Sequence, residues 1–385
     1  MKHHSRPLYS RGAFTLIEML VSTAILVMIL VVVASMANQT SRLWQFTISK
    51  AQQFSGARTA FDTISSRLAQ ATLNTYWDYL GTSGPGGPVG PRTNANSATF
   101  VPTSYAAQSD LRFVSGLTSN LAPNAALTRP LHCVFFEAPI GYSNGTAYNP
   151  PVQLAGLLNL LNTCGFYVEF NTDYTFWPNF LTTVTTMKQR WRFRLMEYLE
   201  PSNQLSTYTY TAGISGSANN ITTAWFSDAS LALGATPGPP VHILAENVVA
   251  LVLLPKLAPS QDPTATGTTP GTLIAPSYAY DSSVATSSTS AAQYSTQNQL
   301  PPEVQVTMVA IDEVSAQKLA IMNGTNMPTL FTGSAYANGP AFTNATYYAT
   351  DLAALEQTLT GYGLNYRVFT TDVIIRAAKW EDVVQ

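Results

Sequence analysis

The sequence predicts an α+β protein in which a long, partly transmembrane N-terminal helix packs on an antiparallel β-sheet domain with long loops. Three observations predict this class. An apolar run follows a short basic segment at the N-terminus. An amphipathic helical pattern comes next. Most of the remaining chain consists of short β-branched and aromatic runs separated by turn residues, which are typical of β-strands.

The composition indicates a secreted or cell-surface protein. The chain has 385 residues, enough for one large domain or two small ones. Charged residues make up only 10% of it, against ~25% in an average soluble domain. Ser, Thr, Asn, Gly and Pro are frequent. No cluster of Lys and Arg is dense enough to follow a phosphate backbone, so we expect no nucleic-acid partner.

The N-terminus has the pattern of a membrane anchor. Residues 1–13 are polar and basic, and residues 14–37 are apolar apart from Glu18. As a helix, the apolar run would extend ~36 Å, which exceeds the ~30 Å hydrocarbon core of a bilayer. The positive-inside rule keeps the basic segment in the cytoplasm. The prediction is therefore a single-pass inner-membrane protein whose C-terminal domain is periplasmic or extracellular.

Two other interpretations of this run explain less. The apolar region of a signal peptide has ~7–15 residues and ends at a small-residue cleavage site, whereas this run is longer and carries its one charge near its start. A generic membrane anchor would leave Glu18 unexplained, because a carboxylate in the bilayer costs at least ~2.5–3.5 kcal/mol.

The segment GAFTLIE, residues 12–18, resembles the class III leader of type IV pilins and pseudopilins. The resemblance implies that the membrane-bound prepilin peptidase cuts just before Phe14 and that the new amine of Phe14 is methylated. Glu18 is then the fifth residue of the mature chain, where the family has Glu. The processing site comprises Gly12, Ala13 and Phe14, and it departs from the family in having Ala13 directly before the cut, where Gly is usual.

The resemblance also implies a pilin-like fold and a structural role, that of a minor pilin or pseudopilin of the J or W type. Such a subunit belongs to a type IV pilus or a type II secretion pseudopilus. Its partners are other pilin-like subunits, the prepilin peptidase and the inner membrane. In assembly, Glu18 of one subunit neutralises the Phe14 amine of a neighbour, which offsets the desolvation of both charges.

Three later runs resemble the family called Verru_Chthon cassette protein C. They are RWRFRLMEYLEP, LPPEVQVTMVAIDE and YRVFTTDVIIRAAKW, and they are distributed over much of the chain. This second resemblance brings no known chemistry.

Residues 38–80 are predicted to continue the helix as an amphipathic segment, because apolar residues recur at steps of three and four. The apolar stripe would contact a sheet or form a coiled-coil seam. A glycine-rich stretch at 81–90 ends the helical pattern, and it lacks the flanking strand and helix of a phosphate-binding loop. The stripe consists of Phe54, Ala57, Phe61, Ile64, Leu68 and Ala71.

Residues 81–385 are predicted to form the β-rich domain. Two runs, at 191–195 and 304–308, alternate apolar and polar residues, which predicts one wet face for each strand. Residues 257–299 have low complexity and are predicted to form a long exposed loop, and 323–344 a second loop. Short helices are expected at 313–322 and 351–360. The expected strands lie at 111–114, 133–137, 165–170, 191–199, 205–210, 241–254, 304–311 and 366–376.

No catalytic motif is evident, so the sequence predicts a non-enzyme without cofactor or metal. HExxH, GxSxG, CxxC and the Walker A pattern are all missing from the sequence. His132 and Cys133 are adjacent, but neighbouring residues of a strand point to opposite faces. Cys133 and Cys164 either form one disulfide or remain two buried thiols.

Several polar and aromatic residues leave two interpretations open. Three pairs of acids could bind calcium, although none lies in a calcium-loop pattern, and solvated surface acids are expected instead. Three tyrosines of the 257–299 segment either anchor that loop or bind a surface glycan. The acid pairs are Asp312 with Glu313, Glu381 with Asp382, and Glu169 with Asp173, and the tyrosines are Tyr278, Tyr280 and Tyr294.

Two further functions compete with the filament subunit. A surface adhesin could use the same anchor, and it would need a binding groove in the large domain. A tethered enzyme would need titratable residues that converge in a pocket. The sequence shows neither feature.

Overall fold

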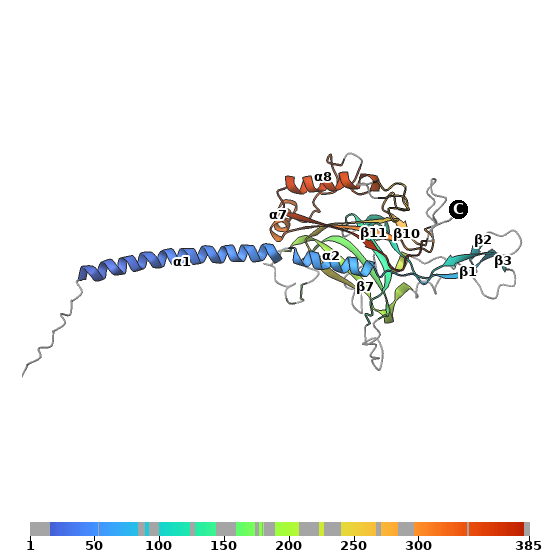
Figure 1. Ribbon diagram of the computed structural model, residues 1–385, viewed down its shortest axis with the longest axis horizontal. Helices are drawn as coiled ribbons and strands as arrows, with labels where there is room; N and C mark the ends of the chain where they lie inside the picture. Colours follow the sequence, from blue (N-terminus) through green and yellow to red (C-terminus); the bar gives the residue numbers. More distant parts are fainter. Residues whose placement is uncertain are drawn as a thin grey trace, which may run out of the picture. The chain divides into compact units, whose positions relative to one another are not determined.

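The computed structural model confirms the α+β class and divides the chain into two compact units, Met1–Gln53 and Phe54–Gln385. The first unit contains the long helix α1 (Leu16–Gln52). The second contains all the strands and the remaining helices (Figure 1). The structure describes residues 16–52, 54–83, 89–91, 100–123, 128–143, 159–173, 177–178, 180, 189–207, 223–226, 240–266, 271–283, 296–336 and 339–380.

Three antiparallel sheets form the second unit, and we name them the large sheet, the small sheet and the ribbon. The large sheet has the order β10-β4-β5-β6-β7-β8, the small sheet β12-β11-β9 and the ribbon β2-β1-β3. The strands of the large sheet are Tyr280–Asp281, Val114–Leu117, His132–Pro139, Leu161–Thr172, Trp191–Glu200 and Val241–Glu246, in that order. Those of the small sheet are Tyr366–Ile374, Glu303–Ile311 and Val248–Lys256, and those of the ribbon Val89–Pro91, Tyr76–Ser83 and Phe100–Gln108.

Asn247 forms the corner between the two larger sheets. The prediction of one strand at 241–254 is wrong, because the run divides into β8 in the large sheet and β9 in the small sheet. Asn247 adopts a left-handed conformation with φ 63°, which Asn tolerates better than most residues. Its N–H donates to Phe193 O at 2.8 Å, and its carbonyl accepts from Ile311 N–H at 2.9 Å. The corner therefore fixes both sheets at the point where the chain passes between them.

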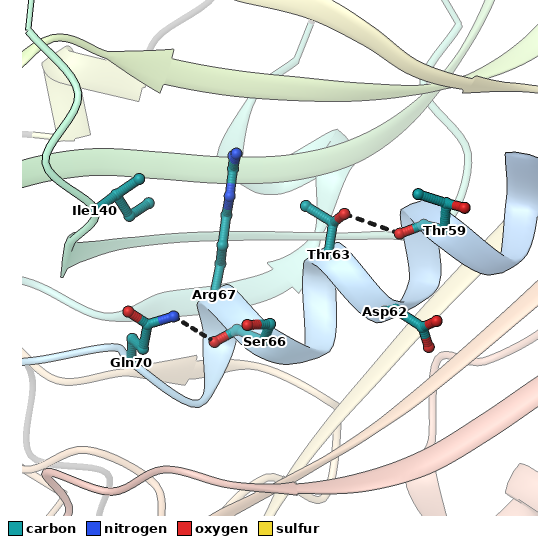
Figure 2. A pocket seen from close by; sticks show the side chains of 7 residues that line it. All are labelled: Thr59, Asp62, Thr63, Ser66, Arg67, Gln70 and Ile140. Atoms are coloured by element: carbon teal, nitrogen blue, oxygen red, sulfur yellow. Dashed lines mark hydrogen bonds between the residues drawn. The ribbon is translucent and has the colours of Figure 1, made fainter.

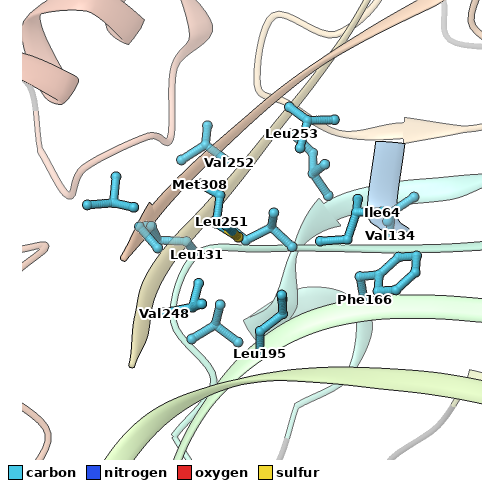
Figure 3. Close-up of a cluster of buried hydrophobic side chains, with 14 of the residues drawn as sticks. Ile64, Leu131, Val134, Phe166, Leu195, Val248, Leu251, Val252, Leu253 and Met308 are labelled. Carbon is cyan, nitrogen blue, oxygen red and sulfur yellow. The ribbon is translucent and has the colours of Figure 1, made fainter. Parts of the chain in front are cut away.

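The main core lies between the large and small sheets. All nine residues of β9 are buried. Figure 3 shows side chains of β9 and β11 clustered with Val134, Phe166 and Leu195 of the large sheet and with Ile64 of α2. Because β9 contacts neighbours on all sides, its sequence is a continuous apolar run without alternation.

Helix α2 (Ser55–Leu68) confirms the predicted packing of the amphipathic stripe on a sheet. It contacts β8 and β12, and the rings of Phe61 and Phe369 lie 5.6 Å apart. The predicted extent of the helix, to residue 80, is wrong. The helix ends at Leu68, Thr72 N–H donates to Glu137 O at 2.9 Å, and β1 begins at Tyr76. The aromatic residues at 76–79 favour a β-strand, so the helix does not continue through them.

Part of the far face of the large sheet is also buried, since the 3₁₀ turn η4 (Thr223–Phe226) packs on it. The ring of Phe226 stacks on Phe135 at 4.7 Å. The predicted wet face of β7 is consequently wrong: Arg192 and Arg194 are buried in ion pairs, described below.

Two helices, α7 (Glu313–Asn323) and α8 (Tyr348–Gly361), confirm the helices predicted near these positions. The hydroxyls of Tyr348 and Thr307 lie 2.6 Å apart, so α8 covers the outer face of β11. The wet face predicted for that strand is therefore also wrong, because Thr307 is buried beneath the helix. The residues at 323–344 form an irregular segment, as predicted, where they are described. The short elements α3 (Thr118–Leu121), η3 (Ser202–Gln204) and η5 (Ala345–Tyr347) complete the described fold.

The segment 257–299 is not the exposed loop that its composition predicts. Its described parts, 257–266, 271–283 and 296–299, bury Tyr278 and Tyr280 in the core. The Asp262 carboxylate accepts from Thr264 N–H at 2.7 Å and from Leu273 N–H at 3.1 Å, which organises the turn. Tyr294 lies outside the described residues. The two described tyrosines therefore anchor the segment, in agreement with the simpler interpretation.

Other expected strands shift or fall partly outside the described residues. The run at 111–114 gives way to β4, which starts at Val114. Residues 205–207 are not a strand, and 208–210 lie outside the described residues. The ribbon strands β1, β2 and β3 were not predicted.

Gly165 lies opposite Phe135 in the β5–β6 pair, and a Cβ at this position would overlap the Phe135 ring. We expect Gly165→Ala to lower the free energy of unfolding by ~1–3 kcal/mol, because the ring is stacked on Phe226 and cannot move freely. Chemical denaturation of the full chain in detergent measures the change. Gly56→Ala in α2 is the matched control, since nothing lies within 4 Å of its added Cβ. Equal stability of the two variants would contradict this packing.

Candidate functional site

The first candidate site is the surface of α1. From Leu16 to Thr40 the helix has 25 residues with mean hydropathy 2.8, and its side chains are exposed around the whole circumference. Such a stretch extends ~37 Å and could therefore span a membrane. A helix that is apolar on all sides must be covered by lipid or by other apolar helices.

The hydroxyl groups on this stretch bond to the helix itself. Ser22 Oγ donates to Met19 O at 3.0 Å, and Thr40 Oγ1 donates to Met36 O at 2.8 Å. Thr23 bonds to its preceding turn in the same way. These bonds satisfy the donors without water, which suits an apolar environment.

Glu18 lies in the first turn of α1, where the helix dipole favours a negative charge. It is exposed and is the only charged residue between Leu16 and Thr40. The predicted processing residues Gly12, Ala13 and Phe14 lie outside the described residues. Of the predicted assembly residues, the structure therefore describes Glu18 alone.

The second candidate site is a groove of about 450 Å³ along the polar side of α2 (Figure 2). Thr63 Oγ1 donates to Thr59 O at 2.8 Å, and Gln70 Nε2 donates to Ser66 O at 2.9 Å. Arg67 pairs with Glu197 of β7. Asp62 is the one acid among the lining residues, which are Thr59, Asp62, Thr63, Ser66, Arg67, Gln70 and Ile140. Because titratable groups do not converge here, the groove suits contact with a partner better than catalysis.

The possible disulfide is contradicted by the structure. Cys133 is paired with Tyr167 in the β5–β6 register, whereas Cys164 is paired with Phe136. Cys133 belongs to the cluster under η4, and Cys164 belongs to the main core on the opposite face of the sheet. Both are free, buried thiols, and burial raises the pKa of each to about 12. The strands β5 and β6 are neighbours, but the two thiol side chains point to opposite faces of the sheet.

His132 is a structural residue that joins three segments. Its Nδ1 accepts from Leu253 N–H at 3.0 Å, so its Nε2 carries the proton that is donated to Phe342 O at 2.9 Å. Phe342 adopts φ 56°, and its N–H donates to Asp351 at 2.8 Å. Burial lowers the pKa of His132 to about 4. The ring therefore links β5, β9 and the segment before α8, and it forms no dyad with Cys133.

The acids considered as possible calcium ligands have protein partners where the structure describes them. The expectation that they are solvated surface acids is wrong for Asp312 and Glu169, which are 2% and 1% exposed. Arg192 donates to both oxygens of Glu313, at 2.5 and 2.6 Å. Asp312 caps α7 by accepting from Ser315 N–H at 2.6 Å. In the third pair, the carboxylate of Glu169 accepts from Arg129 Nε at 2.9 Å.

Of the remaining acids of these pairs, the structure describes Asp173 alone. Asp173 accepts from Arg190 N–H at 2.8 Å. Glu381 and Asp382 lie outside the described residues. Within the described ranges, no three His, Cys, Asp or Glu side chains are grouped as metal ligands.

Comparison with known proteins gives no relative. No family model, no curated protein and no solved structure matches the chain.

Sequence reasoning missed the exposed aromatic residues of the ribbon. Trp77 is 73% exposed, and Tyr76 and Tyr79 are also exposed. The alternation in Tyr-Trp-Asp-Tyr-Leu was the available signal, and it was obscured because the helical pattern was extended through it.

We predict an acid-dependent loss of stability that depends on His132. Its pKa is about 4 in the folded chain and 6.5 ordinarily. Between these values the unfolded state binds a proton that the folded state excludes, so stability falls as the pH drops from 6.5 to 4. The difference corresponds to ~3 kcal/mol.

The measurement compares full-length wild type with His132→Gln at pH 7.5 and 4.5. We expect the variant to be less stable than wild type at pH 7.5. The difference in free energy of unfolding between the two should be smaller by ~3 kcal/mol at pH 4.5. Burial raises the pKa of Glu137 to about 8, so this group stabilises the fold as the pH falls, opposite to His132. Because Glu137 is present in both proteins, its contribution cancels when the wild type and the variant are compared. A stability difference between wild type and variant that is the same at both pH values would contradict a buried, neutral His132.

Proposed function

We propose that this chain is a minor pilin or pseudopilin, a structural subunit of a type IV pilus or a type II secretion pseudopilus. The single observation that carries the proposal is the spacing of Phe14 and Glu18 at the start of an apolar helix. The family motif has Glu at the fifth mature position, and this sequence has Glu18 there when counted from Phe14.

The physical argument concerns a charge that a simple anchor does not need. A carboxylate at the start of a membrane helix is unfavourable unless it meets a cation. Cleavage before Phe14 would create that cation as a new amine. Pairing between Glu18 of one subunit and the amine of another would relieve both charges, while the exposed apolar surface of α1 would bundle with other helices.

The large unit supports a structural role over a catalytic one. The groove along α2 holds one acid, Asp62, and an arginine that is already ion-paired. The buried His132 and both cysteines are enclosed within the fold. We therefore propose a subunit that acts through its surfaces. Its Glu18 favours a place below the filament tip, in contact with at least one subunit above.

Processing is the first test of this function. We expect the mature chain to begin at an N-methylated Phe14, because residues 12–18 resemble the prepilin motif apart from Ala13. Mass spectrometry of protein extracted from membranes of a strain with prepilin peptidase decides the matter. A mature chain that starts at Met1, or near Ser35, would refute the pilin assignment.

The second test is Glu18→Val. The variant should insert and be cleaved normally, since the basic segment and the apolar run are intact, but it should fail to co-purify with its partner pilin-like subunits. A simple anchor would instead insert at least as well and lose nothing.

Ser22→Val is the matched control for this variant. Its hydroxyl bonds only within α1, so its removal should leave co-purification unchanged. Wild-type recovery of partners with Glu18→Val would refute the pairing role.

A further inference from the structure

The ribbon presents aromatic side chains to solvent. Its strands β1, β2 and β3 make their contacts mainly with one another, beside the two packed sheets (Figure 1). Trp77 is 73% exposed and Tyr79 is 38% exposed, whereas Trp225 in the large sheet's cluster is fully buried. An exposed tryptophan near the start of a strand leaves apolar surface in water, so a ligand that covers it would be favoured.

The two aromatic residues lie on one face of β1. Residues two apart in a strand point the same way, at a spacing of ~7 Å. Trp77 is opposite Ala107 in the β1–β3 register, and a methyl group leaves most of the indole uncovered. The register shifts after Leu80, and such a bulge bends and twists a strand. The aromatic face therefore ends at Tyr79.

The base of the ribbon is fixed, which holds this face in place. Asn74 Oδ1 accepts from Asp110 N–H at 2.9 Å, and the Tyr76 hydroxyl donates to Asp110 Oδ1 at 3.3 Å. On the other strand, Asn298 Nδ2 donates to Ala107 O at 2.6 Å. Both strands are thus bonded at the end where Trp77 lies, so little conformational freedom is lost when a ligand binds there.

Charge and size define the partner. Asp78 is the only charged residue in the sequences of β1 and β3, and it alternates with Trp77 and Tyr79 along the strand, so the Trp77–Tyr79 face itself carries no charged residue. One face of the β1–β3 pair, whose strands have eight and nine residues, covers only ~300 Å² from strand spacing and rise, well below the ~800 Å² per partner of a stable protein interface. A thin, uncharged, repeating ligand suits this area.

We propose that the Trp77–Tyr79 face of the ribbon binds a neutral polysaccharide, with sugar rings lying on the aromatic rings. The C–H groups on one side of a pyranose ring are apolar and carry partial positive charge, which matches the negative face of an aromatic ring. The hydroxyl groups at the sugar's edge stay in water. This binding activity goes beyond the filament role and is independent of the Phe14–Glu18 pairing.

The test uses the full chain in a detergent without a sugar headgroup, because a glycosidic detergent would compete. Isothermal titration with cellohexaose, chitohexaose, maltohexaose and xylohexaose measures binding. We expect at least one of these neutral sugars to bind, and Trp77→Ala to weaken that binding roughly tenfold or more, as removal of a central aromatic contact does. Tyr79→Ala should weaken it less, because its ring is less exposed.

Trp44→Ala is the matched control, since Trp44 is 68% exposed on α1 but distant from the ribbon in sequence. It should leave sugar binding unchanged. An unchanged thermal unfolding midpoint for Trp77→Ala would separate lost binding from lost folding. Failure of all four sugars to bind, or equal affinities of wild type and Trp77→Ala, would overturn the proposal. Self-association that Trp77→Ala abolishes, without sugar binding, would assign the face to a second copy instead.

Discussion

The packing of the small sheet on the large sheet is the interaction on which the rest of the structure depends. Strand β9 supplies most of the shared surface, and its nine residues are all buried. Burying one Val or Leu side chain contributes ~1.5–3 kcal/mol, so this strand is among the largest sources of stability in the fold. Helix α2 reaches the same core through Phe61 and Ile64. The position of α2 within the second unit is therefore set by the core.

Apolar surface has two different uses in this chain. In the second unit, apolar residues are buried between the sheets and beneath η4. In α1, from Leu16 to Thr40, they are exposed on every side. The first arrangement stabilises one chain by itself, while the second requires lipid or other helices. This contrast supports our proposal that the chain acts through the surface of α1.

The sequence predicted the parts of the fold that depend on local pattern. The stripe on α2, the helices α7 and α8, and the strands β5, β6, β7, β11 and β12 all follow from periodicity and capping. It did not predict the break at Asn247, because one apolar run can supply two strands when a single residue adopts a left-handed conformation. It also treated the 257–299 segment as exposed, since low complexity does not reveal that Tyr278 and Tyr280 meet the core.

The candidate sites also differ in how far the sequence alone predicts them. The Phe14–Glu18 spacing is a local motif and can be read directly from the sequence. The separation of Cys133 and Cys164 depends on the register of two strands, and a shift of one residue would bring both thiols to the same face. The exposure of Trp77 depends on what the rest of the chain leaves uncovered. No local pattern contains that information.

Charged side chains at one end of the large sheet fix its strands and α7 relative to one another, although charged residues are few in the sequence. The arginines of β7 were expected to face water, yet Arg194 is 1% exposed. A continuous series of ion pairs and hydrogen bonds links Arg129, Glu169, Asn171, Arg194, Glu246, Arg192 and Glu313. This series crosses β6, β7 and β8 and ends on α7, which follows β11 of the small sheet in the chain.

An apolar core would tolerate small slips between these elements, whereas a buried arginine must meet its carboxylate. Replacing Glu169 would leave the buried Arg129 desolvated without its carboxylate, which typically costs ~3–5 kcal/mol. The ion pairs therefore add specificity where the apolar contacts add stability. The end of the large sheet at Arg192 is consequently fixed in two ways, by charge along β7 and α7 and by the backbone bonds of Asn247.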